Sequence, residues 1–349
     1  MPGRVHHAAS GLGRRSLLRL GLSTALTGMA AWSGRARSER PRRWRIGFAN
    51  LTEDPAERVE GLGFTGAEVR ESFLYAARGL PVEMVFFDNG GNRDKALANA
   101  AEALRQKLDF YVQYCADQGA NDDIGRRLEA AGIPMLAINH AVPGAPLYGA
   151  DNQLAGQIAG GALAEFARDT WPDQHLVAII LGDITNTAFG AVGRTDGVAA
   201  ALKAGLPNVD QVRLDSFGNP GKAEGLLRGF SAEQTGTKLL VAALDDATAL
   251  SAKAAVEAAS RSTDTVIVSQ GCDRSMHGGF NDKKEIDPQN RGSIVLGSVA
   301  YFLDRYGYDV LPLALHLLGG GTLPPRSTTQ HVLVTAANVF RIYPPIDMN

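Results

Sequence analysis

The sequence predicts an α/β protein made of two Rossmann-like lobes, each with a mainly parallel sheet. Three observations carry this prediction. From Trp44 onward, short β-branched or aromatic runs alternate with longer alanine-rich stretches, which is typical of consecutive βαβ units. The chain has 349 residues, which suits about two domains of ordinary size. Past residue 45, no apolar run approaches the roughly 18 residues that span a bilayer, because a charge, glycine or asparagine interrupts each one.

Five short runs rich in β-branched and aromatic residues predict the strands of the first half. They are Trp44–Asn50, Val82–Asp88, Phe110–Tyr114, Met135–Asn139 and Leu147–Ala150. Helices are expected between them, each after a side chain that can accept hydrogen bonds from the first backbone N–H groups. The expected helices are 66–78 after Thr65, 95–107 after Asn92 or Asp94, and 124–131 after Asn121 or Asp122, closed by Gly132 and Pro134.

The second half repeats the same alternation. A long alanine- and glycine-rich stretch over residues 153–167 predicts its first helix, so we expect the boundary between the halves at Asp151-Asn152. The expected strands are Leu176–Leu181, Gln211–Leu214, Leu239–Leu244 and Thr265–Ser269. The expected helices are 197–204, 223–230, 250–260 and 310–318.

The charge of the chain is divided unevenly along its length. Residues 1–45 hold ten Lys or Arg residues and a single acid, Glu39. Removing them from the totals of 35 basic and 37 acidic residues leaves 25 and 36, a net charge of about −11 for the rest. An acidic body disfavours nucleic-acid binding, because that function needs a basic face to neutralise phosphates.

The basic arm has the pattern of an export signal. Gly13-Arg14-Arg15-Ser16-Leu17-Leu18-Arg19 precedes an uncharged stretch over residues 20–31, too short for a membrane anchor. The paired arginines resemble a twin-arginine signal, with leucine where phenylalanine is commoner. A disordered basic tail is the alternative. Residues 29–38 offer no clean small-x-small cleavage site, so removal or retention of the segment stays open. We expect residues 1–43 to lie outside the fold and the body to be periplasmic.

Polar side chains follow nearly every predicted strand. Ligands of open parallel sheets bind beyond the carboxyl ends of the strands, so these positions are candidates for function. Any one of them, taken alone, is better explained as a turn residue or a helix cap. Their recurrence in both halves predicts a cleft lined by hydrogen-bonding groups. They are Asn50, Asp88-Asn89, Tyr114-Cys115, Asn139-His140, Asp151-Asn152, Asp183, Asn186, Asp215, Phe217, Asp245-Asp246 and the residues from Gln270 to Asp273.

An ordered set of short motifs resembles the ribose-binding-protein-like family, the type I periplasmic solute-binding proteins of sugar ABC importers. The motifs are Ile46-Gly47-Phe48, Phe87-Asp88, Pro134-Met135-Leu136-Ala137-Ile138-Asn139, Gly149-Ala150-Asp151-Asn152, Arg194-Thr195-Asp196-Gly197 and the stretch from Asp246 to Ala252. The resemblance implies a periplasmic-binding-protein-like I fold with a three-crossover hinge. It places 44–151 and 272–325 in the first lobe and 152–271 and 326–349 in the second. It also implies an inner-membrane ABC permease as partner and a monomeric receptor.

The same resemblance implies a set of ligand-binding positions. Arg194 matches the arginine of an R-x-x-G motif, Phe217 an aromatic that stacks on a sugar, and Asp273 an aspartate after a strand, with Gln270 as its rival. Asn139-His140 stand where sugar binders often have Asp-Arg, and Asp245 where asparagine is frequent, so an ordinary hexose or pentose is not assumed. The full set is Asn50, Tyr114, Asn139, His140, Arg194, Phe217, Asp245, Asp246, Gln270, Asp273 and Tyr301.

These residue types suit a small polar ligand such as a sugar, polyol or sugar derivative. Carboxylates accept hydrogen bonds from vicinal hydroxyls, while arginine and asparagine donate to ring or carbonyl oxygens. His140 could make binding depend on pH, or it could be a neutral histidine in a hydrogen-bonded loop. No cofactor and no metal site is expected, and Cys115 and Cys272 are expected to be free thiols. A ligand sensor for a signalling system and a periplasmic enzyme stay as alternatives, although no nucleophile or acid/base constellation supports the enzyme.

Overall fold

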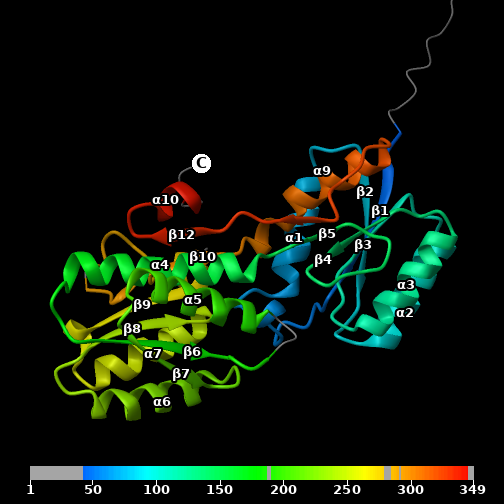
Figure 1. The fold of residues 1–349 in the computed structure, drawn as a ribbon. Helices are drawn as coiled ribbons and strands as arrows, with labels where there is room; N and C mark the ends of the chain where they lie inside the picture. Colours follow the sequence, from blue (N-terminus) through cyan, green and yellow to red (C-terminus); the bar gives the residue numbers. More distant parts are fainter. Residues whose placement is uncertain (1–41, 187–189, 279–283, 291, 345–349) are drawn as a thin grey trace, which may run out of the picture. The chain divides into compact units, whose positions relative to one another are not determined.

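The computed structural model describes residues 42–186, 190–278, 284–290 and 292–344. Residues 1–41 of the expected export signal therefore lie outside the described residues. Two six-stranded sheets make up the fold, each flanked by helices (Figure 1). The predicted α/β class with two mainly parallel sheets is confirmed.

The first sheet has the strand order β11-β5-β4-β3-β1-β2, and all of its neighbours are parallel. Its strands are β1 (Trp44–Asn50), β2 (Val82–Asp88), β3 (Phe110–Gln113), β4 (Met135–Ile138), β5 (Leu147–Gly149) and β11 (Arg326–Thr328). Helices α1 (Gly66–Ala77) and α9 (Tyr306–Leu318) pack together, and α2 (Arg93–Arg105) packs on α3 (Gln118–Ala130). Figure 1 shows these two pairs on opposite faces of the sheet.

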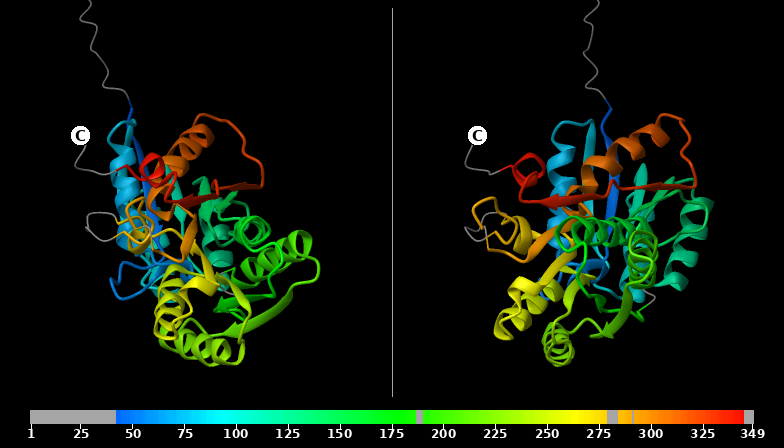
Figure 2. Two further views of the ribbon diagram at one scale, coloured as in Figure 1. Left: turned by 90° about the vertical axis from the view of Figure 1, so that its left-hand side faces the viewer. Right: turned by 60° about the vertical axis from the view of Figure 1, so that its left-hand side comes forward.

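The second sheet has the order β12-β10-β9-β8-β6-β7, and β12 is antiparallel to β10. Its strands are β6 (Leu176–Gly182), β7 (Asp210–Asp215), β8 (Lys238–Ala243), β9 (Thr265–Gly271), β10 (Val295–Ala300) and β12 (Val332–Thr335). The accompanying helices are α4 (Asn152–Thr170), α5 (Ala191–Gly205), α6 (Pro220–Glu233), α7 (Asp246–Ala258), α8 (Arg274–His277) and α10 (Val339–Ile342). The turned views in Figure 2 show α4 and α5 on one face and α6 and α7 on the other.

The alternation of side chains along the central strands explains the layers. In β6, Ala178 and Ile180 join the core that also contains Val198 of α5, whereas Ile179 and Leu181 join the core under α6 and α7. Successive side chains of a strand point to opposite faces, so a strand covered on both sides needs apolar residues at every position. This is why the sequences of these strands are continuous apolar runs.

Three connections join the two sheets, as the resemblance implied. The first follows β5 at Ala150-Asp151, the second follows β10 at Tyr301-Phe302, and the third links β11 to β12 through residues 329–331. Sheet membership differs from the expected lobe boundaries at two strands. β10 lies in the range 272–325 but pairs with β9 of the second sheet, and β11 pairs with β5 of the first. Because β9 and β10 pair in parallel, the connection between them starts and ends in the second sheet.

The starts of α1 and α2 agree with the caps expected from the sequence. Thr65 forms a capping box with Glu68 at α1, and Asn92 caps α2 through the N–H of Lys95. α3 begins earlier than expected, because Asp117 accepts from the N–H of Ala120. Asn121, one of the expected caps, is buried inside the helix, where its side chain donates to the carbonyl of Cys115.

Within the described residues, no helix combines the length and the apolar character needed to cross a membrane. Cys115 and Cys272 are both free and buried. Their thiols have raised pKa values because burial disfavours the thiolate.

Candidate functional site

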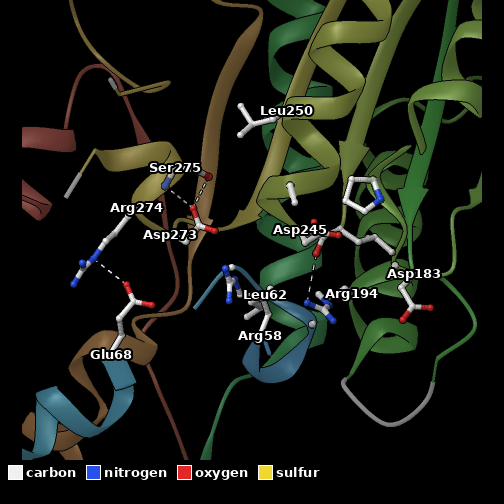
Figure 3. A pocket seen from close by; sticks show the side chains of 16 residues that line it. Arg58, Leu62, Glu68, Asp183, Arg194, Asp245, Leu250, Asp273, Arg274 and Ser275 are labelled. Carbon is white, nitrogen blue, oxygen red and sulfur yellow. Dashed lines mark hydrogen bonds and ion pairs between the residues drawn. The ribbon is translucent and has the colours of Figure 1, made fainter. Parts of the chain in front are cut away.

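A cavity of about 440 Å³ lies beyond the carboxyl ends of β6, β7, β8 and β9. The second lobe contributes Asp183, Arg194, Asp245 and Asp273, each from a segment after one of these strands or from the helix that follows it. The first lobe contributes α1 and the segment before it, through residues that include Arg58 and Glu68 (Figure 3). The cavity therefore takes charged side chains of both signs from both lobes.

Arg194 reaches the cavity from the first turns of α5, where it is almost fully buried. Its guanidinium donates to the carbonyl of Leu244 at 3.4 Å and to the carbonyl of Glu60 at 3.3 Å. Gly197, the glycine of the R-x-x-G motif, is needed for helix packing. A Cβ on Gly197 would lie 2.2 Å from the carbonyl oxygen of Gln153, so only glycine allows α5 to approach α4 this closely.

Asp245 combines a structural contact with a place at the cavity wall. Its carboxylate caps α7 by accepting from the backbone N–H of Thr248 at 2.8 Å and from the Thr248 hydroxyl at 2.7 Å. Burial raises the pKa of Asp245, and the hydrogen bonds from Thr248 and the charge of Arg194 oppose that rise.

Asp246 points away from the cavity and organises the end of the second sheet. Its carboxylate accepts from the hydroxyls of Ser269 and Ser298 at 2.6 and 2.7 Å and from the N–H of Asp273 at 2.7 Å. Burial and then the charge of Asp273 raise its pKa well above the ordinary value. Asp246 therefore holds Asp273 in place at the cavity wall, while Asp273 caps the short helix α8 through Ser275.

Across the cavity, Glu68 of α1 forms an ion pair with Arg274 of α8 at 2.9 Å (Figure 3). The two residues belong to different lobes, because α1 covers the first sheet and α8 follows β9 of the second. Both side chains line the cavity, so this ion pair connects the two lobes at the cavity wall.

The first lobe has its own polar cluster around Glu60. The Tyr114 hydroxyl donates to Oε1 of Glu60 at 2.8 Å, and Nε2 of His140 lies 3.0 Å from the same oxygen. Asn139 donates to the Tyr114 hydroxyl at 3.3 Å and accepts from the Tyr306 hydroxyl at 3.3 Å. Tyr114, Asn139 and His140, which the sequence assigned to the site, therefore lie together around Glu60. None of these three residues lines the cavity.

The Glu60–His140 contact perturbs both groups. Burial opposes ionisation of Glu60, but the hydrogen bond and charge of His140, together with the bond from Tyr114, outweigh it and lower the pKa of Glu60. Burial also disfavours a charged His140, yet the hydrogen bond and charge of Glu60 raise the pKa of that imidazole. Opposite shifts of this kind are expected of an ion pair in a partly dehydrated site.

The other predicted site residues lie outside the cavity wall. Asn50 is buried and donates to the carbonyl of Gly66 at 2.8 Å, which joins the end of β1 to the start of α1. The side chains of Gln270 and Tyr301 bond each other at 3.0 Å beside the second crossover. Phe217 is 65% exposed, and the Lys222 ammonium lies 3.7 Å from the centre of its ring.

Asp183, which was expected among the polar residues after the strands, also lines the cavity. Three residues that were not predicted shape the site: Arg58, Glu60 and Glu68. All three lie in or after residues 51–65, a long connection between β1 and α1 that has no regular period. Only the folded chain shows that this connection turns into the space between the lobes.

Comparisons with known proteins agree with this architecture. A model of the periplasmic binding protein domain matches residues 65–320, which is more than half of the chain. No curated protein sequence matches the chain significantly.

Several solved structures share the fold at low sequence identity. An ABC transporter solute-binding protein from Bacillus halodurans with bound myo-inositol has a TM-score of 0.61 and 18% identity, covering 87% of this chain and 99% of that one. A periplasmic solute-binding protein from Actinobacillus succinogenes with bound D-allose has a TM-score of 0.66 and 14% identity, covering 86% and 100%. An ABC transporter solute-binding protein from Mycobacterium smegmatis with bound glycerol has a TM-score of 0.62 and 20% identity, covering 86% of this chain and 96% of that one.

The two sheets, the three connections between them and the matched domain model lead to one assignment: the chain belongs to the periplasmic binding protein family.

Proposed function

We propose that this chain is the solute receptor of an ABC importer and captures a small polar solute between its two lobes. The observation that carries the proposal is the 440 Å³ cavity, whose wall combines arginine and carboxylate side chains from both lobes. A polyhydroxylated solute offers hydroxyl donors to carboxylates and oxygen acceptors to arginines, so it can satisfy such a wall. A purely apolar solute would remove water from these charged side chains without offering them a hydrogen bond, which is unfavourable.

The ligand class follows from the same groups and is supported by the relatives. The solved neighbours named above hold myo-inositol, D-allose and glycerol, all of them polyols or sugars. We assign the direct contacts to Arg194, Asp245 and Asp273, joined by Arg58 and Asp183.

The remaining predicted site residues take supporting parts in this proposal. Asp246 positions Asp273, Asn50 positions α1, and Gln270 with Tyr301 positions the second crossover. Phe217 stands at an exposed position where it can stack on a bound ring.

Closure of the two lobes around the solute would create the form that an inner-membrane permease recognises. Hinge closure of two domains around a ligand is an established mode of ligand-gated change. The export signal resembling a twin-arginine sequence would place the receptor, as a monomer, in the periplasm. No step of this function needs a catalytic group.

A thermal-shift screen of the purified full-length chain tests the proposal. The panel contains pentoses, hexoses, polyols, sugar phosphates, nucleosides and amino acids. A ligand at 100 times its Kd adds about 2.7 kcal/mol of stability, which the screen detects. No shift with any sugar or polyol contradicts the proposed ligand class, and turnover of a shifting compound would favour an enzyme.

Two variants then locate the site. Asp183→Asn and Arg58→Ala should each weaken binding by about tenfold or more, because a hydrogen bond to a charged group contributes roughly 1.5–3 kcal/mol. Glu57→Ala is the matched control, since this exposed carboxylate lies beside Arg58 but not on the cavity wall. Equal affinity of all three variants and the wild type would place the ligand elsewhere.

A further inference from the structure

The connection between β1 and α1 places one buried acid between the lobes. Glu60 lies in a short turn over Val59–Gly61 and is only 8% exposed, although the preceding residues 54–58 are exposed. Its φ of 59° lies in the left-handed region, which a residue with a Cβ occupies at a cost. Such a conformation persists only where surrounding contacts hold it, and it often marks a functional position.

The contacts that hold Glu60 come from both lobes. On the first lobe, its carboxylate binds the Tyr114 hydroxyl at 2.8 Å and Nε2 of His140 at 3.0 Å. On the second lobe, the guanidinium of Arg194 donates to its backbone carbonyl at 3.3 Å. One residue of the chain therefore presents two acceptor oxygens, one to each side of the inter-lobe space.

A hydroxylated solute would use the same donors. A sugar hydroxyl oxygen accepts hydrogen bonds from tyrosine, imidazolium and guanidinium groups just as a carboxylate or carbonyl oxygen does. We propose that Glu60 is an internal occupant of the solute site, holding the donors of Tyr114, His140 and Arg194 until a solute displaces it. The inference rests on the proposed function, because it describes competition for that site.

The position of the cavity agrees with this competition. Gly61, Leu62 and Gly63, which directly follow Glu60, form part of the cavity wall, whereas Tyr114 and His140, which contact the Glu60 carboxylate, are not part of the wall. A solute in the cavity touches this segment from one side. A solute that also reaches the first-lobe donors has to move Glu60. Glu60 thereby disfavours weak ligands, because only a solute that makes these hydrogen bonds in place of Glu60 can contact both the cavity wall and the first-lobe donors.

The first experiment needs no ligand. Wild type, Glu60→Gln and Glu57→Ala are compared by NMR titration of the histidine rings, with the His140 signal assigned by a His140→Asn variant. The wild-type His140 should titrate above 6.5, and Glu60→Gln should lower its midpoint while Glu57→Ala leaves it unchanged. An unchanged midpoint in Glu60→Gln would overturn the contact on which the inference depends.

The second measurement follows the distance between the lobes. Spin labels at Ala98→Cys on α2 and Arg228→Cys on α6 report it, since both positions are exposed and the native cysteines are buried. Without ligand, Glu60→Ala should lengthen or broaden the distance distribution, and Glu57→Ala should match the wild type. Identical distributions for Glu60→Ala and the wild type would show that Glu60 does not join the lobes.

Calorimetric titration with myo-inositol, D-allose and glycerol then tests competition. Glu60→Ala should bind the best of these probes about tenfold more tightly than the wild type or Glu57→Ala, because the internal competitor is gone. Equal or weaker binding by Glu60→Ala overturns the occupant role but leaves the receptor function intact. If no probe binds the wild type or Glu60→Ala, the proposed ligand class fails, and the occupant role fails with it whatever the two ligand-free readouts give.

Discussion

His331 should be a main determinant of hinge stability, because its ring bonds the three connections between the lobes to one another. It lies on the third connection and is 8% exposed. Its Nε2 accepts from the N–H of Asp151 on the first connection, and its Nδ1 lies 3.0 Å from the carbonyl of Ala300 at the second. An N–H group can only donate, so Nε2 carries no proton and Nδ1–H donates to Ala300.

The substitution His331→Leu removes both bonds and keeps a side chain of similar bulk. It leaves the N–H of Asp151 and the carbonyl of Ala300 without their partner, and an unsatisfied buried group costs about 1–3 kcal/mol. Asp151 is half-buried, so water can restore part of its loss. The T-shaped contact of the His331 ring with Tyr301, at 4.7 Å, is also lost. We expect a total loss of about 2–4 kcal/mol in the free energy of unfolding.

Urea unfolding at pH 7.5 measures this loss, with His316→Leu as the control. His316 is an exposed histidine with one bond to a loop carbonyl, so its replacement should cost less than about 1 kcal/mol. The reasoning is refuted if His331→Leu costs no more than the control.

The pH dependence gives a second check on His331. Burial lowers the pKa of His331 in the fold, against the opposing bond to Ala300 and the charge of Asp151. Its contribution is therefore complete above the unfolded value of 6.5 and is lost as the pH falls below it. The wild type should lose more stability than His331→Leu between pH 6.5 and pH 5, and parallel curves would contradict the assignment.

Two further predictions concern helix packing and the Glu60 cluster. Gly156→Ala should destabilise the protein by about 1–3 kcal/mol, because a Cβ there would lie 2.2 Å from the carbonyl oxygen of Arg194. Gly161→Ala in the same helix meets no atom within 4 Å and should stabilise it by about 0.5–1 kcal/mol, so thermal unfolding of the pair should give opposite signs. The Glu60–His140 pair should stabilise the fold most between about pH 4.5 and 6.5, since Glu60 has a lowered and His140 a raised pKa. The difference in urea midpoint between wild type and Glu60→Gln should therefore shrink as the pH rises through the raised pKa of His140, and a difference that grows with pH would contradict the ion pair.

The strands and helices with strong local signals were predictable. The capping box at Thr65 and the cap at Asn92 act through residues three positions away, so the sequence alone contains them. The strands β11 and β12 were not found, because they have three and four residues and pair with strands that are distant in sequence; β10, with six residues, was also missed. Such strands form through the sheet that receives them, not through local preference.

The site was predictable where it depends on strand ends. Asp183, Asp245 and Asp273 meet at one cavity because parallel strands bring their carboxyl ends to one edge, whereas Arg194, which was assigned through the R-x-x-G resemblance, reaches the same cavity from α5. The outward or inward direction of each side chain was not predictable from this rule. Neighbours such as Asp245 and Asp246 point to different surroundings, one to the cavity wall and the other to buried serines.

The sequence by itself determined the class of this protein: two α/β halves, an acidic body behind a basic arm, and polar residues at the strand ends. These features depend on local periodicity, composition and the geometry of parallel sheets. Only the tertiary structure decided that Glu60 stands between Tyr114, His140 and Arg194, and that His331 bonds the three connections. Both arrangements join residues that are more than 30 positions apart through segments without regular period, and their position is set by the packing of the two lobes.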